Sequence, residues 1–553
     1  MVNVITVASR AAMAALASPS AGDTVFLTEA GRVGFFECLA GSAPVTDTLQ
    51  GLYVASSTTG FYYARVREGD IGRPEWFGAL PGSAASDCLS ALQACTSLCQ
   101  RTILDAKDYY ITDLFQFAYS GKVLEGQAGS GTNFGLGYHP DGIGTAGGTR
   151  VILTGANVVS GTVFQFGSSS GSSDDGSITR NAFVRNIKFA RDCSVYTPRA
   201  SLSGDPIDCV KGVIMSFIST SGMYNVKSYD SAVGFHCFGV VNSTLDECNV
   251  RRTTAASTST NDFFVGFLIG GYAPNYGYIG ANASIYLRHC TVFDSNPAFS
   301  TSVGLKLFGY IADTFVDQFE MARLNYGIVI DGSDSSGVTI PTGSGNGGSH
   351  QDVTIDKAVI DGVDIGGIVV RNLNDTNSTM ISNPYIAVAN GSQSGRAALS
   401  ITNAAGRLNV TQGRILGYNA PGVQVTNVNG FSIRGIVIRD CSAPLVFNNC
   451  GMFDAEPIIF ALGVSATNAC SLTGCFRGYI RPHIDGAPGM VTYGVSLDSA
   501  CNFLEVDGSV INPGAMVTIS SAYKVLFAGN DASTGSGAAA FAAASNVLSG
   551  VKG

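Results

Sequence analysis

The chain has 553 residues, of which 69 are glycine, and charged residues make up only 13% of it. So little charge and so much glycine are unlike a helical protein of this size and indicate β structure with many turns. The net charge of −9 disfavours nucleic-acid phosphates as the main ligand. The sequence has no apolar run of about 18 residues, so we expect no insertion into a membrane.

The cysteines and histidines do not form a recognisable metal-binding pattern. The 14 cysteines include no CxxC pair, and the five histidines are scattered, so we expect neither a metal ion nor another cofactor. Many unpaired thiols fit folding in a reducing cytoplasm. Near the N-terminus, Arg10 follows apolar and hydroxyl residues instead of preceding an apolar run, which is the wrong order for a secretion signal.

Residues 1–70 are expected to form a small β module. The segments 22–41 and 48–66 alternate apolar and polar residues, as strands of such a module do. Residues 71–115 are expected to hold a junction and a capping helix, with Ser86 as its N-cap and Leu89, Leu92 and Cys95 or Cys99 along one stripe. Cys88 falls on the same helical face as Cys95 and Cys99, and all three are expected to be buried apolar groups.

A short repeat fixes the architecture expected for residues 116–515. It consists of a small residue, then apolar–x–apolar, then usually Gly, Asn or Asp, and it starts at Gly212, Gly234, Gly266, Gly304, Gly327, Gly367, Ala398, Gly422, Pro444 and Gly494. The shortest steps indicate a rung of roughly 22–25 residues, as in stacked repeats. Each copy has period two, so pairs such as Leu305/Leu307 and Ile328/Ile330 are expected to point inward and stack in apolar ladders.

A second ladder precedes the first in each rung. Its members are Cys248/Val250, Cys290/Val292, Phe319/Met321, Ala358/Ile360 and Ile436/Ile438. Together the two ladders predict an all-β fold, a single-stranded parallel β-helix, because one rung cannot bury its own apolar face. The last stretch, 537–553, loses the pattern, and residues 516–553 are expected to be a C-terminal assembly element or a tail.

The order of these parts resembles the phage tailspikes of the pectate-lyase-like superfamily. The residues that carry the resemblance are the junction Glu75-Trp76-Phe77-Gly78-Ala79, with the only tryptophan of the chain, followed by a capping helix and a long β-helix. Those proteins usually continue with GDGxTDD, where this chain has LPGSAASD and keeps only Gly82 and Asp87. The resemblance implies a right-handed β-helix, a homotrimer, docking of residues 1–70 to a phage tail or adaptor protein, and a virion protein made in the bacterial cytoplasm. It also implies binding of a bacterial surface polysaccharide.

Cleavage of a glycosidic bond needs two carboxyl groups, one as acid and one as base or nucleophile. Strand parity places Glu320 outward between Phe319 and Met321, and Asp361 outward after Ile360. With the two rungs aligned, the Cα atoms of these acids are expected about 8 Å apart. We therefore predict Glu320 as acid and Asp361 as base or nucleophile, or the reverse.

Other acids of the same segment give a second choice. Asp317 is expected to stack on Asp356 at about 5 Å, an arrangement that raises one pKa or holds a cation. Asp331 is expected over Arg371 as a surface ion pair. The residues expected to contact the glycan are Asp331, Arg371, Arg323, Tyr272, Tyr276 and His350, and the weaker candidate acids are Asp246, Asp294 and Asp364.

Three functions remain open at this point, because fold alone does not prescribe activity. The first is endo-acting hydrolysis of a polysaccharide by paired carboxylates. The second is a polysaccharide lyase, for which Asp352, Asp356, Asp361 and Asp364 beside Arg371 supply a base and a cation. The third is a trimeric adhesin that binds a glycan without cutting it.

Overall fold

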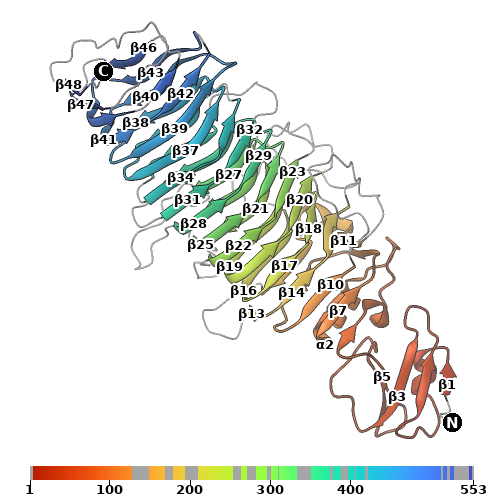
Figure 1. Cartoon of the computed structure of the whole chain (residues 1–553). Helices are drawn as coiled ribbons and strands as arrows, with labels where there is room; N and C mark the ends of the chain where they lie inside the picture. The colour runs from red at the N-terminus through yellow and green to blue at the C-terminus, as the bar shows by residue number, and fades with distance from the viewer. Residues whose placement is uncertain are drawn as a thin grey trace. The chain divides into compact units, whose positions relative to one another are not determined.

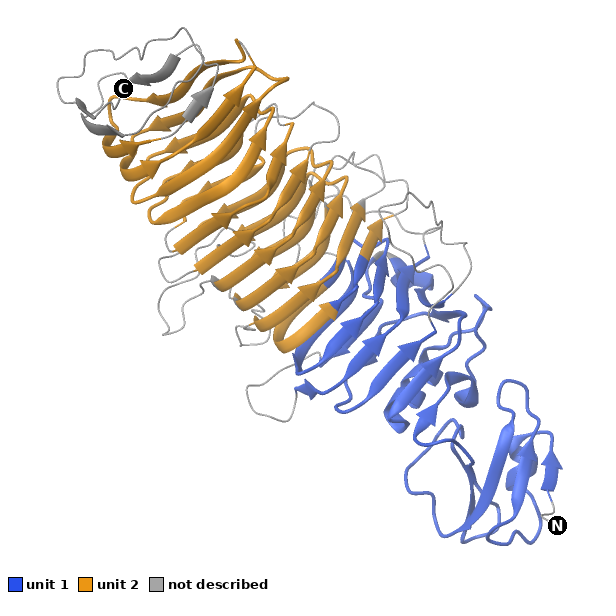
Figure 2. Ribbon diagram, in the orientation of Figure 1, with its two compact units in different colours: residues 1–198, 210–235, 246–249 blue, residues 199–209, 236–245, 250–553 orange. Residues whose placement is uncertain are grey.

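The chain divides into two compact units (Figure 2): residues 1–198, 210–235 and 246–249 form the first, and residues 199–209, 236–245 and 250–553 the second. The computed structural model describes residues 4–127, 148–168, 178–192, 210–252, 263–270, 282–294, 301–308, 311–332, 350–373, 378–387, 397–404, 407–417, 421–487, 489–507, 509–511, 515–519, 523–528 and 547–550. Outside the described residues lie Tyr272 and Tyr276 and much of 516–553.

The first unit begins with the predicted β module. Its five-stranded sheet has the order β1 (Val4–Val7), β2 (Thr24–Leu27), β3 (Gly34–Ala40), β5 (Phe61–Arg65) and β4 (Tyr53–Ala55). The alternation seen in the sequence buries one face of this sheet, formed by Val7, Val25, Leu27, Phe36, Cys38, Val54 and Tyr63. The alanine-rich stretch forms α1 (Arg10–Ala14), which adds Met13 to this core and is capped by the Ser9 hydroxyl.

The capping helix of the first unit starts later than predicted. α2 (Leu89–Leu98) has Cys88 at its N-cap without a side-chain cap, so the prediction of Ser86 was wrong. The Asp87 side chain satisfies one backbone donor at the start of this helix, because its carboxylate accepts a hydrogen bond of 3.0 Å from the Leu89 amide. Cys88, Cys95 and Cys99 are buried as predicted, and α2 contacts β6, β7 and β9 of the first rungs.

Behind α2, the first unit continues as parallel strands. They are β6 (Ile71–Gly72), β7 (Arg101–Leu104), β8 (Asp108–Ile111), β9 (Phe115–Phe117), β10 (Val123–Gly126), β11 (Thr149–Leu153), β12 (Phe164–Gly167), β13 (Thr179–Arg180), β14 (Phe183–Arg185), β15 (Ile187–Arg191), β16 (Lys211–Ser219), β17 (Gly222–Tyr224) and β18 (Lys227–Tyr229), with the 3-10 helices η1 (Pro74–Phe77) and η2 (Gly155–Val159). β19 (Val233–Asp246) and β20 (Asn249–Arg252) contribute residues to both units.

The second unit is a stack of three-sided parallel rungs (Figure 1), which confirms the parallel β-helix. Face A consists of β21 (Phe263–Gly270), β24 (Thr301–Phe308), β27 (Tyr326–Asp331), β30 (Gly366–Arg371), β33 (Leu399–Thr402), β36 (Pro421–Thr426), β38 (Ala443–Asn448), β40 (Ala466–Thr473), β43 (Val491–Leu497) and β46 (Ala515–Ile519). Face B consists of β22 (Asn282–Arg288), β25 (Ile311–Asp317), β28 (His350–Asp356), β31 (Ser378–Ser382), β34 (Arg407–Thr411), the first parts of β37 (Phe431–Arg439) and β39 (Asp454–Ala461), β41 (Phe476–Ile480), β44 (Asn502–Val506) and β47 (Tyr523–Ala528).

Face C is the narrowest of the three. It consists of β23 (Thr291–Asp294), β26 (Glu320–Ala322), β29 (Val359–Asp361), β32 (Tyr385–Ala387), β35 (Arg414–Leu416), the second parts of β37 and β39, β42 (His483–Gly486) and β45 (Ser509–Ile511). Faces A and C hold the two predicted ladders, and face B is a third side. Past Ile519 the backbone still pairs in parallel, as β47 on β44 and β48 (Val547–Gly550) on β47.

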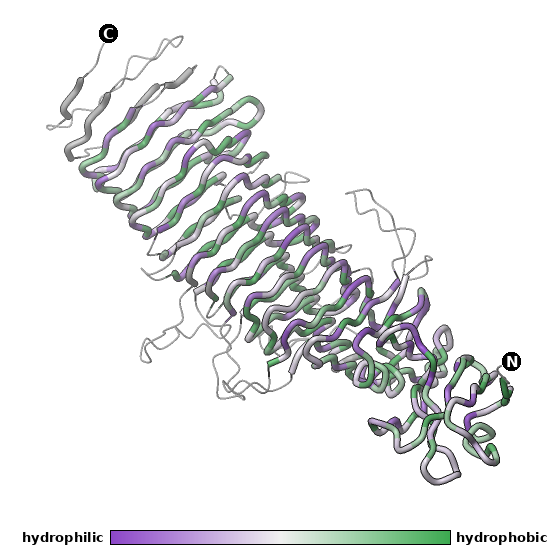
Figure 3. The backbone as a smooth tube through the Cα atoms, turned by 60° about the horizontal axis from the view of Figure 1, so that its bottom comes forward, coloured by the Kyte–Doolittle hydropathy of each residue, from purple (hydrophilic) through white to green (hydrophobic). Residues whose placement is uncertain are grey.

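The predicted inward residues form the core. Leu305, Leu307, Ile328 and Ile330 are all 0% exposed, and Leu305 pairs with Ile328 on the next rung. Along the strands, hydrophobic and hydrophilic residues alternate, as Figure 3 shows. This alternation is what a sheet with one buried face requires.

One corner of the rungs uses asparagines, which tolerate a left-handed backbone. Asn403, Asn427 and Asn449 stack at one corner with φ of 50°, 54° and 51°. Asparagine adopts this conformation at less cost than most residues. Their amides also pair between rungs, because Asn427 donates to Asn403 at 3.0 Å and Asn449 donates to Asn427 at 3.3 Å. Each corner therefore turns the chain and helps hold the next rung in register.

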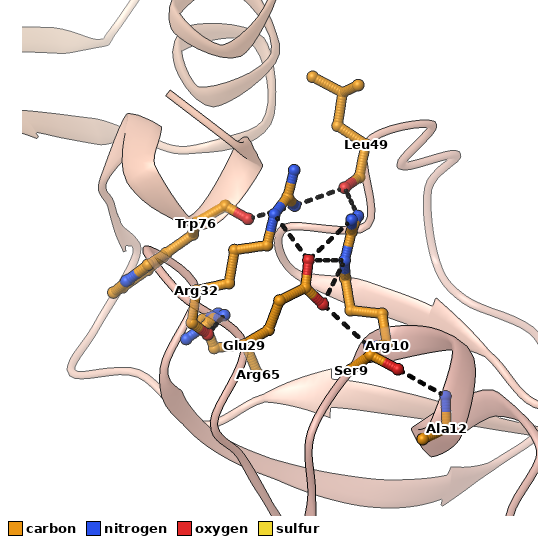
Figure 4. Close-up of polar contacts among 8 residues, drawn as sticks. All are labelled: Ser9, Arg10, Ala12, Glu29, Arg32, Leu49, Arg65 and Trp76. Carbon is orange, nitrogen blue, oxygen red and sulfur yellow. Dashed lines mark hydrogen bonds and ion pairs between the residues drawn. The ribbon is translucent and has the colours of Figure 1, made fainter. Parts of the chain in front are cut away.

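The junction tryptophan is held by two arginines of the β module (Figure 4). Arg32 donates to the Trp76 carbonyl at 2.7 Å, and the Arg65 guanidinium lies 4.5 Å from the Phe36 ring centre and 4.7 Å from that of Trp76. Burial, and then the charge of Arg32, lower the pKa of Arg65 to about 10. Glu29 offsets this concentration of positive charge, since it pairs with Arg10 at 3.0 Å and with Arg32 at 3.4 Å.

Replacing Glu29 by Gln is expected to make the Trp76 junction less stable at neutral pH but not in acid. Burial alone would raise the pKa of Glu29, but the hydrogen bonds and charges of Arg10 and Arg32 outweigh it and lower the pKa. The stabilisation is therefore present above the ordinary carboxyl pKa and is lost as the pH falls through the lowered one. We expect E29Q to cost about 1 kcal/mol at pH 7, measured by urea unfolding with the fluorescence of the only tryptophan. The exposed Glu37 of the same sheet supplies the control E37Q, and an equal loss in E37Q, or a loss that persists in acid, would contradict the assignment.

On β30, the glycine that starts the repeat is required by packing. A Cβ atom on Gly367 would collide with the Ile386 side chain and lie 2.7 Å from the Ala398 carbonyl oxygen, whereas one on Gly366 would have neighbours at 3.4–3.5 Å. We expect Gly367→Ala to destabilise the second unit by roughly 1–3 kcal/mol, and Gly366→Ala to change little. Thermal unfolding followed by circular dichroism compares the two, and equal midpoints would refute the packing argument.

Candidate functional site on face C

The predicted pair Glu320 and Asp361 lies on adjacent strands of face C. Met321 pairs with Ile360 and Glu320 with Val359, which is the register expected from the sequence. Met321 and Ile360 are buried, at 1% and 0% exposure, so Glu320 and Asp361 point outward. Asp361 stands beside Ala322, two residues beyond Glu320 on the neighbouring strand, and this places the two Cα atoms about 8 Å apart.

Neither carboxylate is paired with a side chain of the described residues. Within the described part of the chain, neither Glu320 nor Asp361 accepts a side-chain hydrogen bond or forms an ion pair. Glu320 is partly shielded and Asp361 is exposed. Both acids are therefore available to an external ligand.

The second predicted pair is engaged with a lysine. Asp317 pairs with Asp356 in the strand register, as expected, but Lys357 lies 2.9 Å from Asp356 and 3.7 Å from Asp317. Burial would raise the pKa of Asp356, yet hydrogen bonds from Lys357, Ser382 and Asn383 outweigh it and lower the pKa. The stack was expected to raise a pKa or to hold a cation. The lysine contacts and the lowered pKa disfavour Asp356 as an acid, and the bound cation stays a prediction.

Asp331 and Arg371 are engaged with each other. They pair in register, the Arg371 guanidinium lies 2.7 Å from the Asp331 carboxylate, and Asn372 donates to the same group at 3.1 Å. The pair was expected at the surface, but Asp331 is only 4% exposed. These contacts give both residues a structural role.

A ring flanked by two cations lies beside the carboxylate pair. Phe293 pairs in register with Ala322, and the guanidinium carbons of Arg251 and Arg323 lie 5.4 Å and 5.9 Å from its ring centre. Arg323 occupies the corner directly after β26, with φ of 59°. Its backbone amide donates to the Asp361 carbonyl at 3.1 Å. The predicted Arg323 is thus next to both acids.

Asp364 follows in the turn after Asp361, and its amide donates to the Leu324 carbonyl at 2.9 Å. Although the side chain reaches the surface, partial burial raises the pKa of Asp364. A raised carboxyl pKa favours the protonated form, which is what a proton donor needs. Asp364, a weaker candidate from the sequence, nevertheless lies outside the strands that carry Glu320 and Asp361.

The remaining predicted residues contribute less. His350 begins β28 and its backbone pairs with Ile311, while its side chain lies outside the described residues. Among the residues that the structure describes, no group of three His, Cys, Asp or Glu side chains is arranged to hold a metal ion. The described helices include none that is both long and apolar enough to span a membrane.

Sequence reasoning named Arg323 but missed the other aromatic and cationic residues of face C, which are Arg251, Phe293, Tyr385 and Arg414. Parity around Val292 would have turned Phe293 outward, and the alignment of β23 on β26 would have placed it beside the acids. Tyr385 and Arg414 pair across adjacent strands of the same face, and both followed from the rung alignment in the same way. The contact of Arg323 with Phe293 left no such signal, because strand parity does not apply to a corner residue.

No family model matches the chain, and no curated protein matches it. Among solved structures, the gp42 tailspike of Acinetobacter phage vb_AbaP_AS12 is 11% identical over 96% of this chain and 75% of its own length, with a TM-score of 0.39. Tailspike protein 3 of bacteriophage CBA120 is 12% identical over 91% of this chain and 66% of its own, with a TM-score of 0.47. The tailspike gp49 of Acinetobacter baumannii bacteriophage Fri1, a capsular polysaccharide depolymerase, is 10% identical over 94% of this chain and 75% of its own, with a TM-score of 0.34. Identities and TM-scores this low carry no conclusion about activity, and the β-helix is established by the chain's own strand register.

Loss of the buried Asp331 carboxylate is expected to destabilise the second unit. Asp331→Asn removes the ion pair and weakens the hydrogen bond from Asn372, and because Arg371 remains partly hydrated, we expect a cost of about 1–3 kcal/mol. Asp352, which is exposed and has a left-handed backbone that asparagine also adopts, provides the control D352N. Urea unfolding followed by circular dichroism measures both, and a D331N protein as stable as D352N would argue against the structural role.

Proposed function

We propose that the chain binds and hydrolyses a bacterial surface polysaccharide, with Glu320 and Asp361 as the catalytic pair. One observation carries the proposal. Two outward carboxylates lie on adjacent strands of face C, without a partner among the described side chains. Of the other predicted acids of the segment, Asp317, Asp356 and Asp331 are held by Lys357 or Arg371. Asp352 and Asp364 lie outside the strands of face C.

We propose an inverting reaction for the pair. In such a reaction the carboxyl groups lie about 6.5–9.5 Å apart, which leaves room for a water molecule between the base and the sugar. Cα atoms about 8 Å apart allow outward side chains to reach that separation. Glu320, the more shielded residue, is proposed to protonate the leaving oxygen. Asp361, which is exposed to solvent, is proposed to activate the water that attacks the sugar ring.

The arrangement of the first unit fits a tailspike. We propose that residues 1–70 dock to a phage tail or adaptor protein, that the chain acts as a homotrimer, and that it resides in the virion. Support comes from the order of the parts, with a compact β module followed by the junction at Trp76 and the capping helix α2. The arginine contacts of Trp76 fix the module to the start of the β-helix within the first unit.

A lyase is the second candidate, and one observation favours it. Arg323 lies next to the carboxylate pair, and a lyase needs a cation to neutralise a uronate carboxylate while a base removes a proton. Lysis leaves an unsaturated uronate that absorbs ultraviolet light, whereas hydrolysis leaves a new reducing end without that absorbance. An adhesin would bind the polymer and leave its length unchanged.

Separate replacement of the two acids tests the proposal. Glu320→Gln and Asp361→Asn keep the shape of each side chain and remove its charge, so each is expected to lower cleavage at least about 100-fold with an unchanged unfolding midpoint. The measurement is the size distribution of capsule and lipopolysaccharide preparations from a panel of bacteria, read by mass spectrometry after incubation.

The control variant is Glu505→Gln, a partly exposed acid on face B. It should retain full activity. Wild-type cleavage by both E320Q and D361N would refute the site. If Asp317→Asn or Asp356→Asn alone abolished cleavage, the reaction would belong to face B.

A further inference from the structure

We propose that face C is a binding track for an acidic polysaccharide, with cation–aromatic sets on both sides of the carboxylate pair. The inference rests on the proposed function and adds the class of its substrate. Its residues are Arg251, Phe293 and Arg323 on one side and Tyr385 and Arg414 on the other, and all of them belong to the second unit.

Register places these residues in one strip. Phe293 pairs with Ala322, and Ala322 pairs with Asp361. On the other side of the pair, Val359 separates Glu320 from Tyr385, and Tyr385 pairs with Arg414. With about 4.8 Å per rung, Phe293 lies about two rungs, or 10 Å, from Asp361, and Tyr385 lies equally far from Glu320. The strip therefore runs along the stack of rungs, across the strands.

The first cation–aromatic set is formed by contacts within the chain. Arg251 and Arg323 approach the Phe293 ring at 5.4 Å and 5.9 Å, distances at which a cation is attracted to a ring face. A guanidinium held in this way loses less freedom when it binds a carboxylate, because its position is already restricted. The ring edge and the two guanidiniums together suit a sugar that carries a carboxylate.

The second set lies beyond the acids. Arg414 is exposed and Tyr385 is partly exposed, whereas the next residue along each strand, Ile415 or Ile386, is buried in the core. The two outward side chains stand about 4.8 Å apart at the backbone, so the tyrosine ring can support a sugar ring while the guanidinium reaches its carboxylate. A polymer that crosses Glu320 and Asp361 then meets a cation on each side of the bond to be cut.

The charge of the chain makes these cations decisive. With a net charge of −9, the chain as a whole does not attract a polyanion. Repulsion between exposed charges is screened beyond about 8 Å in physiological salt, so binding depends on the cations inside the strip. A neutral glycan has no group that would require Arg251, Arg323 and Arg414 along its path.

The test uses the full chain with Glu320→Gln, so that binding is measured without cleavage. An array of purified capsular and O-antigen polysaccharides, some neutral and some uronate-bearing, is the probe. We expect binding to acidic polymers only, and we expect chemical reduction of their carboxyl groups to weaken it at least about ten-fold. Arg323→Gln and Arg414→Gln, each added to this background, should each weaken it by a similar factor.

The matched control is Arg407→Gln, which removes an exposed arginine from face B and should leave the affinity unchanged. Binding of a neutral polymer that the wild type also cleaves would overturn the inference, while the catalytic pair would stand. If R323Q and R414Q, each in the Glu320→Gln background, bound an acidic polymer as tightly as Glu320→Gln alone, the binding track would be overturned. Binding to no polysaccharide of the array would count against the inference and the proposed function together.

Discussion

Register between successive rungs is the constraint on which the candidate site depends. A slip of one residue between β26 and β29 would turn Glu320 or Asp361 into the core and expose Met321 or Ile360. Two devices oppose such a slip. On later rungs, the left-handed corners at Asn403, Asn427 and Asn449 join neighbours through their amides. On the rung of Asp361, the close packing of Ile386 against Gly367 leaves no room for a Cβ atom there. The outward position of Glu320 and Asp361 therefore depends on packing contacts made by residues elsewhere in the stack.

The architecture could be predicted because its signal is repeated. Each face A strand buries two apolar residues in every rung, so the same short pattern returns after a similar number of residues, and Leu305, Ile328 and Ile368 are all fully buried. Once the ladders were aligned, parity alone placed Glu320 and Asp361 outward. Corners and caps carry no periodic signal. For this reason the cap at Cys88 and the contact of Arg323 with Phe293 were visible only in the structure.

Parity gives the direction of a side chain but neither its burial nor its partners. Asp331 and Asp361 both follow outward positions in the sequence, yet Asp331 is 4% exposed and held by Arg371, whereas Asp361 is exposed. The difference arises from which residue the next rung places opposite each acid: Arg371 stands beside Asp331, and Ala387 beside Asp361. An acid that is held by an ion pair can therefore be distinguished from one without a described partner only when its neighbours on the adjacent rungs are known.

The three faces of the second unit are unequal as places for a polymer, and this inequality favours face C. On face A, the outward positions Leu268, Val329 and Val369 are at most 8% exposed. On face B, outward acids are largely held by cations, as Asp356 is by Lys357 and Glu456 by Arg481. Face C combines short strands, a small residue at Ala322 and two acids without a described partner. Stability of the stack draws on inward residues of all three faces, so outward residues of face C can change without loss of the core.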